Sequence, residues 1–322
     1  MTCKILQFSS RRNKARPSAS ELFSMACDEF AKTEDPFYVE KALPLLEEAV
    51  QLNHPEATAF LAEIYYFGEG VAQNYEKARI LYEKALALNQ RDVLATLGSM
   101  YYFGQGVKCD YFKAMRYFIQ AAKEGNPRAM HNLAVQFTFG HGVKKNIELA
   151  KMYYRRAAEL GCFESFYNLA LIYYEGQGCE KDPKKGIYYL KKAAALNDVK
   201  ALFYLGTIYR EGKTVKTDFG VARRYFERAS ENGSDSALFE LGAMYSSGEG
   251  VEKDYKRALE YFKQAADLGN GLAYFNMGVF YCNGYGVRVN LKKARKYFEN
   301  AADLGVREAR VALRHIDMIL EN

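Results

Sequence analysis

Apolar residues recur along the chain in a pattern that repeats every 36 residues. In one copy of this pattern, Val93, Leu97 and Met100 follow one another at steps of four and three residues, which places their side chains on one side of an α-helix. A second helical stripe, with Ala114 and Phe118, follows after a short loop segment. Each copy therefore predicts two antiparallel helices of roughly a dozen residues. One such pair cannot bury its apolar face alone, so the copies are expected to stack.

Glycine and short polar residues mark the ends of the predicted helices. A glycine opens the loop in each copy, because a residue without Cβ adopts the left-handed conformation cheaply and ends the first helix. These glycines are Gly68, Gly104, Gly140, Gly176, Gly212, Gly248 and Gly284. Six residues later stands an Asn or Asp, whose side chain can accept from the free backbone N–H groups of the second helix. These residues are Asn74, Asp110, Asn146, Asp182, Asp218, Asp254 and Asn290.

The copies share the pattern Ala-x-x-x-Leu-Gly-x-x-Tyr-x-x-Gly-x-Gly-Val, which the copy that begins at Ala237 follows closely. This pattern resembles the Sel1-like repeat over about Pro55 to Gly305. The resemblance implies an all-α fold, a right-handed α/α superhelical solenoid of antiparallel helix pairs related to tetratricopeptide arrays, with about seventeen helices. It also implies a role in binding or scaffolding other proteins.

The resemblance divides the chain into a tail and one solenoid domain. Residues 1–19 carry five basic residues and no acid, and they are expected to be a disordered tail or, alternatively, an organelle transit segment. Residues 20–54 form a degenerate first repeat, in which Ser20 caps one helix and Asp35-Pro36 start another that Pro44 distorts. Residues 55–305 hold seven full repeats, and residues 306–322 form a C-terminal capping helix.

Charge, apolar runs and cysteine usage indicate where the protein is located and which classes of partner it binds. No segment approaches 18 consecutive apolar residues, so no membrane span is predicted. The six cysteines form no Cys-x-x-Cys and do not follow the repeat, which favours a reducing compartment. The predicted location is therefore cytoplasmic: a bacterial cytosol, or a host cytosol for a delivered effector, with organelle targeting as the third alternative. The net charge is +6, but acids such as Glu227 and Glu260 interrupt the basic second helices, so no nucleic-acid partner is expected.

The sequence predicts no catalytic residue, metal site or cofactor. Gly206 and Gly212 before Lys213-Thr214 stand one residue too far apart for a phosphate-binding loop. The four histidines lie in no metal-ligand or nucleophile motif. The chain is therefore not expected to be an enzyme. The alternative, a small-ligand-binding protein or an enzyme of unassigned chemistry, depends on three off-pattern polar residues, His131, Arg210 and Glu211.

The first helices hold the candidate binding residues. When the alanine of Ala-x-x-x-Leu-Gly is position 1, rotation by 100° per residue turns positions 3, 7 and 10 away from the core, with position 11 beside them. First helices line the concave surface of tetratricopeptide-like arrays. Aromatic and polar side chains at these positions predict a partner-binding surface made of Tyr66, Phe67, Tyr102, Phe103, His131, Phe139, Tyr167, Tyr174, Phe203, Arg210, Phe239 and Phe275.

Two interpretations of these residues stay open. They form an interaction site, or tight curvature buries them against adjacent first helices. The first interpretation predicts a protein–protein interaction scaffold, an adaptor that holds a partner protein or peptide in an aromatic-lined concave groove, as a bacterial effector or signalling adaptor would. The chain itself is expected to be a monomer.

Overall fold

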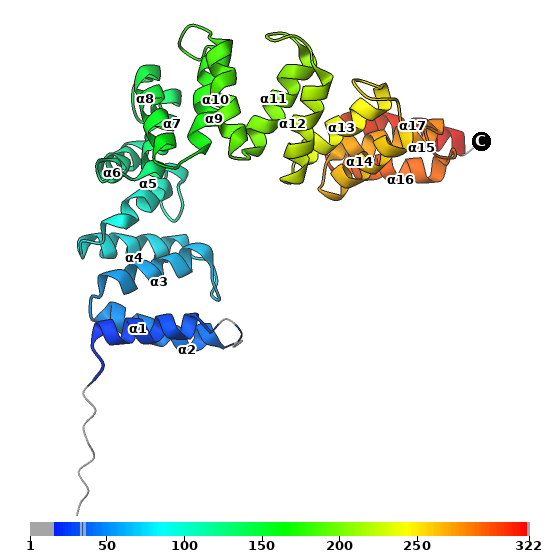
Figure 1. Cartoon of the computed structure of the whole chain (residues 1–322). Coiled ribbons are helices and arrows are strands. Elements are labelled where there is room, and N and C mark those ends of the chain that lie inside the picture. Colours follow the sequence, from blue (N-terminus) through cyan, green and yellow to red (C-terminus); the bar gives the residue numbers. More distant parts are fainter. Residues whose placement is uncertain (1–15, 33, 35–36, 321–322) are drawn as a thin grey trace, which may run out of the picture. The chain divides into compact units, whose positions relative to one another are not determined.

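The computed structural model describes residues 16–32, 34 and 37–320, and within them the chain forms seventeen α-helices and no strand (Figure 1). The chain divides into two compact units, unit 1 (Met1–Asn146) and unit 2 (Ile147–Asn322). Unit 1 holds α1 (Ala19–Phe30), α2 (Tyr38–Gln51), α3 (Pro55–Phe67), α4 (Tyr75–Ala87), a 3-10 turn (Arg91–Val93), α5 (Leu94–Phe103), α6 (Tyr111–Lys123) and α7 (Pro127–Phe139). The predicted array of about seventeen helices is thereby confirmed.

Unit 2 continues the same alternation of first and second helices. It holds α8 (Ile147–Glu159), α9 (Glu164–Glu175), α10 (Pro183–Ala195), α11 (Val199–Glu211), α12 (Phe219–Glu231), α13 (Asp235–Ser247), α14 (Tyr255–Asp267), α15 (Gly271–Asn283), α16 (Leu291–Asp303) and α17 (Arg307–Leu320). None of the described helices is long and apolar enough to cross a membrane.

In four of the helix pairs, a glycine on the first helix leaves room for an aromatic ring of the second helix, so the two helices pack closely. In the pair α5/α6, a Cβ on Gly98 would lie 2.5 Å from a ring carbon of Phe118. In the pair α13/α14, a Cβ on Gly242 would lie 2.7 Å from the ring of Phe262. Both rings are almost completely buried, so the second helix inserts an aromatic side chain into the space that the glycine leaves.

The predicted helix ends are confirmed at both kinds of boundary. The loop-opening glycines adopt left-handed conformations, with φ of 76° at Gly68 and 72° at Gly104. The side chains of Asn74 and Asp110 accept hydrogen bonds from the backbone N–H groups of residues 77 and 113. Short-range sequence signals therefore define where each helix pair begins and ends.

The degenerate first repeat differs from the prediction at its start. Ser18, and not Ser20, caps α1, since its hydroxyl accepts from the backbone N–H of Glu21 while the Glu21 carboxylate accepts from the backbone of Ser18. This reciprocal pair is a capping box. Pro44 lies inside α2, and the helix continues past it to Gln51. The predicted start at Asp35-Pro36 and most of the predicted tail lie outside the described residues.

Candidate functional site

Three phenylalanines at position 11 of successive first helices extend into solvent. Phe67, Phe103 and Phe139 are the last residues of α3, α5 and α7, and they are 62%, 68% and 62% exposed. Each stands immediately before a left-handed glycine, where the backbone leaves the helix. The chain therefore presents a large apolar ring at the same place in three consecutive repeats of unit 1. We call these three residues the phenylalanine stripe.

A tyrosine at position 10 lies beside each of the first two stripe residues. The ring centroids of Tyr66 and Phe67 are 5.0 Å apart, and those of Tyr102 and Phe103 are 4.9 Å apart, both with edge-to-face geometry. Both tyrosines are half-buried, and burial raises the pKa of each phenol. They are neutral at physiological pH and act as fixed supports for the exposed rings.

The same tyrosines connect each repeat to the loop of the next. The Tyr66 hydroxyl donates to Oε1 of Gln105 at 3.0 Å, and the Tyr102 hydroxyl is 2.6 Å from Nδ1 of His141. The imidazole of His141 stacks on Tyr111 at 4.8 Å and on Phe139 at 5.6 Å between ring centroids. Sequence reasoning did not include Gln105 and His141 in the site. The signal that could have found them is their common distance, 39 residues after the tyrosine.

Position 3 has a different environment from the one predicted. Ala59 and Ala95 are buried, and so is Thr138 at position 10. The prediction that positions 3 and 10 turn away from the core is therefore wrong for these residues. The reason is that neighbouring helices cover this side of the first helix as well.

The position 3 phenylalanines of unit 2 are half-buried against the second helices. The ring centroids of Phe203 and Phe226 are 5.6 Å apart, those of Phe239 and Phe262 are 5.6 Å apart, and those of Phe275 and Phe298 are 5.3 Å apart. The partner ring is fully or almost fully buried in every pair. These three predicted site residues therefore contribute to core packing.

Tyr167 and Tyr174 lie in a cluster of phenols on α9 and α11. The ring of Tyr204 is 6.5 Å from Tyr167 and 5.5 Å from Tyr174 between centroids. The Tyr204 hydroxyl donates to a carboxylate oxygen of Glu175 at 3.2 Å, and burial raises the pKa of this phenol. The cluster joins two consecutive first helices, and sequence reasoning did not identify Tyr204 as its centre.

Arg210 is held by two carboxylates of the following repeat. Its Nε and Nη2 donate to the two carboxylate oxygens of Glu249 at 2.6 and 3.2 Å, and its Nη1 donates to Glu240. Burial raises the pKa of Glu240, whereas the hydrogen bonds from Arg210 lower the pKa of Glu249. The guanidinium group of Arg210 therefore forms ion pairs within the protein, with Glu240 and Glu249. His131, the other off-pattern residue of this group, is half-buried on α7.

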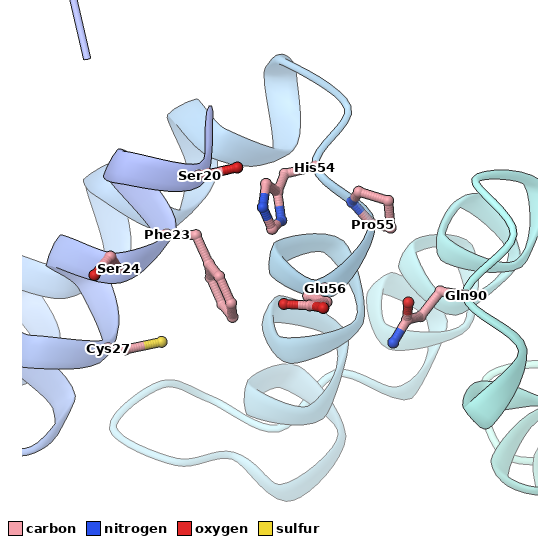
Figure 2. Close-up of a pocket in the computed structure, with 8 residues that line it drawn as sticks. All are labelled: Ser20, Phe23, Ser24, Cys27, His54, Pro55, Glu56 and Gln90. Carbon is pink, nitrogen blue, oxygen red and sulfur yellow. The ribbon is translucent and has the colours of Figure 1, made fainter. Parts of the chain in front are cut away.

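The first helices of unit 1 also border a pocket of about 560 Å³. Figure 2 shows its wall between α1 and the start of α3, with Phe23 of α1 pointing toward His54 and Glu56. His54 caps α3, because its Nδ1 accepts from the backbone N–H of Ala57 at 3.1 Å. Burial raises the pKa of the Cys27 thiol, which keeps the sulfur protonated and a poor nucleophile. This pocket offers hydrogen bonds and an apolar ring but no activated group.

Among the described residues, no three His, Cys, Asp or Glu side chains gather as metal ligands. The arrangement of the stripe, the supporting tyrosines and the pocket provides surfaces for binding.

A family model for the Sel1 repeat matches seven consecutive segments of the chain. They are residues 55–90, 94–126, 127–162, 165–198, 199–234, 235–270 and 271–306. The resemblance inferred from the repeated pattern is thereby confirmed. Among curated proteins, none matches this chain.

Several solved structures are similar to this protein. A Sel1 repeat protein from Oxalobacter formigenes is 26% identical with a TM-score of 0.76, and the match covers 92% of this chain and 87% of that one. A protective antigen of uropathogenic Escherichia coli, which displays an SLR fold, is 27% identical with a TM-score of 0.72. That match covers 94% of this chain but only 65% of the antigen, so the chain spans about two thirds of its length.

A further solved structure shows the same fold without close sequence similarity. Yeast Tom70 is 14% identical with a TM-score of 0.54, over 98% of this chain and 67% of that one. At this identity the likeness concerns the arrangement of helices alone.

Proposed function

Because this chain belongs to the Sel1 repeat family, whose helical arrays are in general scaffolds for protein interaction, we propose that it is an adaptor that binds a segment of a partner protein on the phenylalanine stripe of unit 1. The observation that carries the proposal is the exposure of Phe67, Phe103 and Phe139 at equivalent places in three consecutive repeats. Exposed apolar side chains that stand in a row are typical of interaction surfaces. Aromatic anchors of this kind supply most of the energy of many interfaces.

Covering the stripe would contribute a substantial part of the binding energy. Covering one exposed phenylalanine is worth roughly 1.5–3 kcal/mol, and this surface offers three of them. The tyrosines beside Phe67 and Phe103 already hold the ends of the helices in place through bonds to the next loop. The partner therefore meets a surface that needs little ordering, and less of the interaction energy is lost on binding.

The cellular setting is part of the proposal. Cys27, Cys109, Cys162, Cys179 and Cys282, the cysteines among the described residues, are free thiols. Free thiols are typical of a reducing compartment. This favours an adaptor in the cytoplasm, either of a bacterium or of a host cell that receives the protein.

The proposal is tested with a triple variant of the stripe. Phe67→Ala with Phe103→Ala and Phe139→Ala removes the exposed rings. The matched control is Phe112→Ala with Phe163→Ala and Tyr188→Ala, which removes exposed aromatic rings elsewhere on the surface. Proteins retained from a cell lysate by the native chain and both variants are quantified, and the Kd of each purified partner is then measured.

We expect the stripe variant to bind its partner at least tenfold more weakly, while the control variant keeps the native Kd. Circular dichroism of both variants checks that the helices persist. Equal Kd values for all three chains would contradict the assignment of the binding surface to the stripe.

A further inference from the structure

The surroundings of the stripe are acidic at its Phe67 end. Glu63 precedes Phe67 by four residues on α3, so the two side chains are neighbours on one face of the helix. Glu69 follows in the loop, and Asp92 lies in the 3-10 turn that leads into α5. All three carboxylates are exposed. A carboxylate, Glu63, therefore lies one helical turn from the ring of Phe67, and the charges of Glu69 and Asp92 act on this carboxylate.

These carboxylates repel one another. The carboxyl group of Glu63 is partly shielded from solvent although the residue as a whole is exposed, and this partial burial raises its pKa, as do the nearby charges of Asp92 and Glu69. The neighbouring base Arg91 forms an ion pair with Glu124. Arg128, at the start of α7, is the cation whose charge opposes the rise in the pKa of Tyr66. A cation brought next to Glu63 would thus relieve a repulsion that already exists in the free protein.

The acidic character is confined to one end of the stripe. Serine and valine, Ser99 and Val135, take the place of Glu63 one turn before Phe103 and Phe139. The loops that follow these two helices carry Lys108, Lys144 and Lys145. The charge around the stripe therefore changes along it, and this gives a bound segment a preferred direction.

The spacing of the stripe suits a helical partner. Among the helices that carry the stripe, α5 and α7 contact each other, and packed helices lie about 8–10 Å apart, so anchors for Phe103 and Phe139 are expected about 10 Å apart. In an α-helix, residues seven apart are separated by about 10.5 Å and share one face. In a β-strand, residues three apart span about 10 Å but point to opposite faces. The tyrosines beside the stripe widen it, and the broad apolar face of an amphipathic helix fits this width.

Resting on the proposed function, we infer that the partner segment is an amphipathic α-helix with apolar residues at seven-residue intervals and with Lys or Arg beside the residue that contacts Phe67. The net charge of the protein is +6, so a general attraction to the whole chain would favour an acidic segment instead. A preference for a basic helix must therefore come from the local acids Glu63, Glu69 and Asp92.

Three fluorescein-labelled 18-residue peptides serve as probes. All have Leu at positions 1, 4, 8, 11, 15 and 18, in accord with the helical period, and the polar positions are Lys, Gln or Glu. Their Kd values for the native chain are measured by fluorescence anisotropy at 50 mM and at 500 mM NaCl. The charge variant is Glu63→Gln with Glu69→Gln. The matched control, Glu180→Gln with Glu252→Gln, removes two exposed acids from loops of unit 2.

We expect the Lys peptide to bind at least tenfold more tightly than the Glu peptide, with the Gln peptide between them. The charge variant should reduce this ratio to about threefold or less, as should 500 mM NaCl, because salt screens exposed charges. The control variant should leave the ratio unchanged.

The outcomes separate this inference from the proposed function. Equal binding of the three peptides, or no binding of any of them, overturns the inference of a basic helix. An equal effect of the control variant also overturns it, because the preference would then be a property of net charge. If instead the triple stripe variant binds the Lys peptide as well as the native chain does, the proposed function itself is wrong.

Discussion

Unit 1 and unit 2 are built from the same repeat but use aromatic side chains on their first helices differently. In unit 1, position 11 is the exposed Phe67, Phe103 or Phe139, whereas position 3 is the buried Ala59 or Ala95 in α3 and α5. In unit 2, position 11 becomes polar and position 3 becomes large. The position 11 residues there are Glu175, Glu211, Ser247 and Asn283, and three of the four position 3 residues are Phe203, Phe239 and Phe275.

The contrast shows that the number of aromatic residues does not identify a binding surface. The position 3 rings of unit 2 pack on rings of the second helices, as Phe239 does on Phe262 at 5.6 Å. The position 11 rings of unit 1 lie at the end of a helix, where the chain turns away at a left-handed glycine. The place of a ring within the repeat therefore decides whether it is buried on folding or remains available to a partner.

The connections between repeats differ in the same way. The first two position 10 tyrosines of unit 1 form neutral hydrogen bonds to the next loop, as Tyr66 does to Gln105. In unit 2, Arg210 occupies position 10 and forms ion pairs with Glu249 and Glu240. The residue spacing of 39 is the same for Tyr66–Gln105 and Arg210–Glu249. The same pair of positions therefore connects successive repeats by a neutral hydrogen bond in unit 1 and by an ion pair in unit 2.

The comparison is tested most strongly by removing one ring from each unit. We expect Phe239→Ala to lower the free energy of unfolding by about 2–3 kcal/mol, since buried phenylalanines cost about 3–5 kcal/mol and Phe239 is half-buried. Phe103→Ala should change the free energy by less than about 0.5 kcal/mol, because its ring is exposed. Urea denaturation measures both values.

Amide hydrogen exchange locates the effect of each change. The loss caused by Phe239→Ala should appear as faster exchange in α13 and α14, which the ring joins. If the two variants lose equal stability, the distinction between a packing position and a surface position is wrong.

The ionic connection of unit 2 gives the next effect in size. Arg210→Met leaves Glu240 and Glu249 without their cation, and we expect a loss of about 1–3 kcal/mol at pH 7, reduced by the partial exposure of the three side chains. Arg224→Met, which removes an exposed arginine of α12, serves as the control and should have little effect.

The pH dependence of this loss has a definite sign. Arg210 lowers the pKa of Glu249 and opposes the rise that burial causes in the pKa of Glu240. In the variant both folded-state pKa values move upward, so the folded chain binds protons above pH 4.5, the ordinary value for glutamate. The variant therefore regains stability as the pH falls from 7 toward 4.5. Urea denaturation across this range should show the difference between the two chains shrinking, and a constant difference would contradict an ionic origin.

Local features of the fold could be predicted from the sequence because they depend on nearby residues. The glycine at 68 and the cap at Asn74 follow from conformational preference and from short-range hydrogen bonds. The cap of α1 was assignable in the same way, since Ser18 and Glu21 have the spacing of a capping box. Ser20 lacks a Glu or Gln three residues later, which is the signal that favours Ser18.

The orientation of the first-helix side chains could be predicted only in part, because it depends on residues far away in sequence. A helical rotation of 100° per residue correctly separates the core residue Leu97 from the exposed Phe103. It does not reveal that Phe226 reaches Phe203, or that neighbouring helices cover Ala59. Tertiary packing, and not the period of one helix, sets these positions.

The neutral connection of unit 1 gives the smallest effect. Tyr102→Phe keeps the ring that packs on Phe103 and Tyr111 but removes the hydroxyl that lies 2.6 Å from Nδ1 of His141. We expect a loss of about 0.5–1.5 kcal/mol, the usual worth of a neutral hydrogen bond. Burial raises the pKa of Tyr102, so its hydroxyl is neutral and can donate to a neutral imidazole or accept from an imidazolium. The loss should therefore persist from pH 5 to pH 8.

Urea denaturation measures this loss, and ¹⁵N NMR of His141 provides a second measure. In the native chain the neutral ring should carry its proton on Nε2, whereas the variant should populate both tautomers. Unchanged nitrogen shifts in the variant would show that Tyr102 does not orient His141, and the connection would then consist of ring stacking alone.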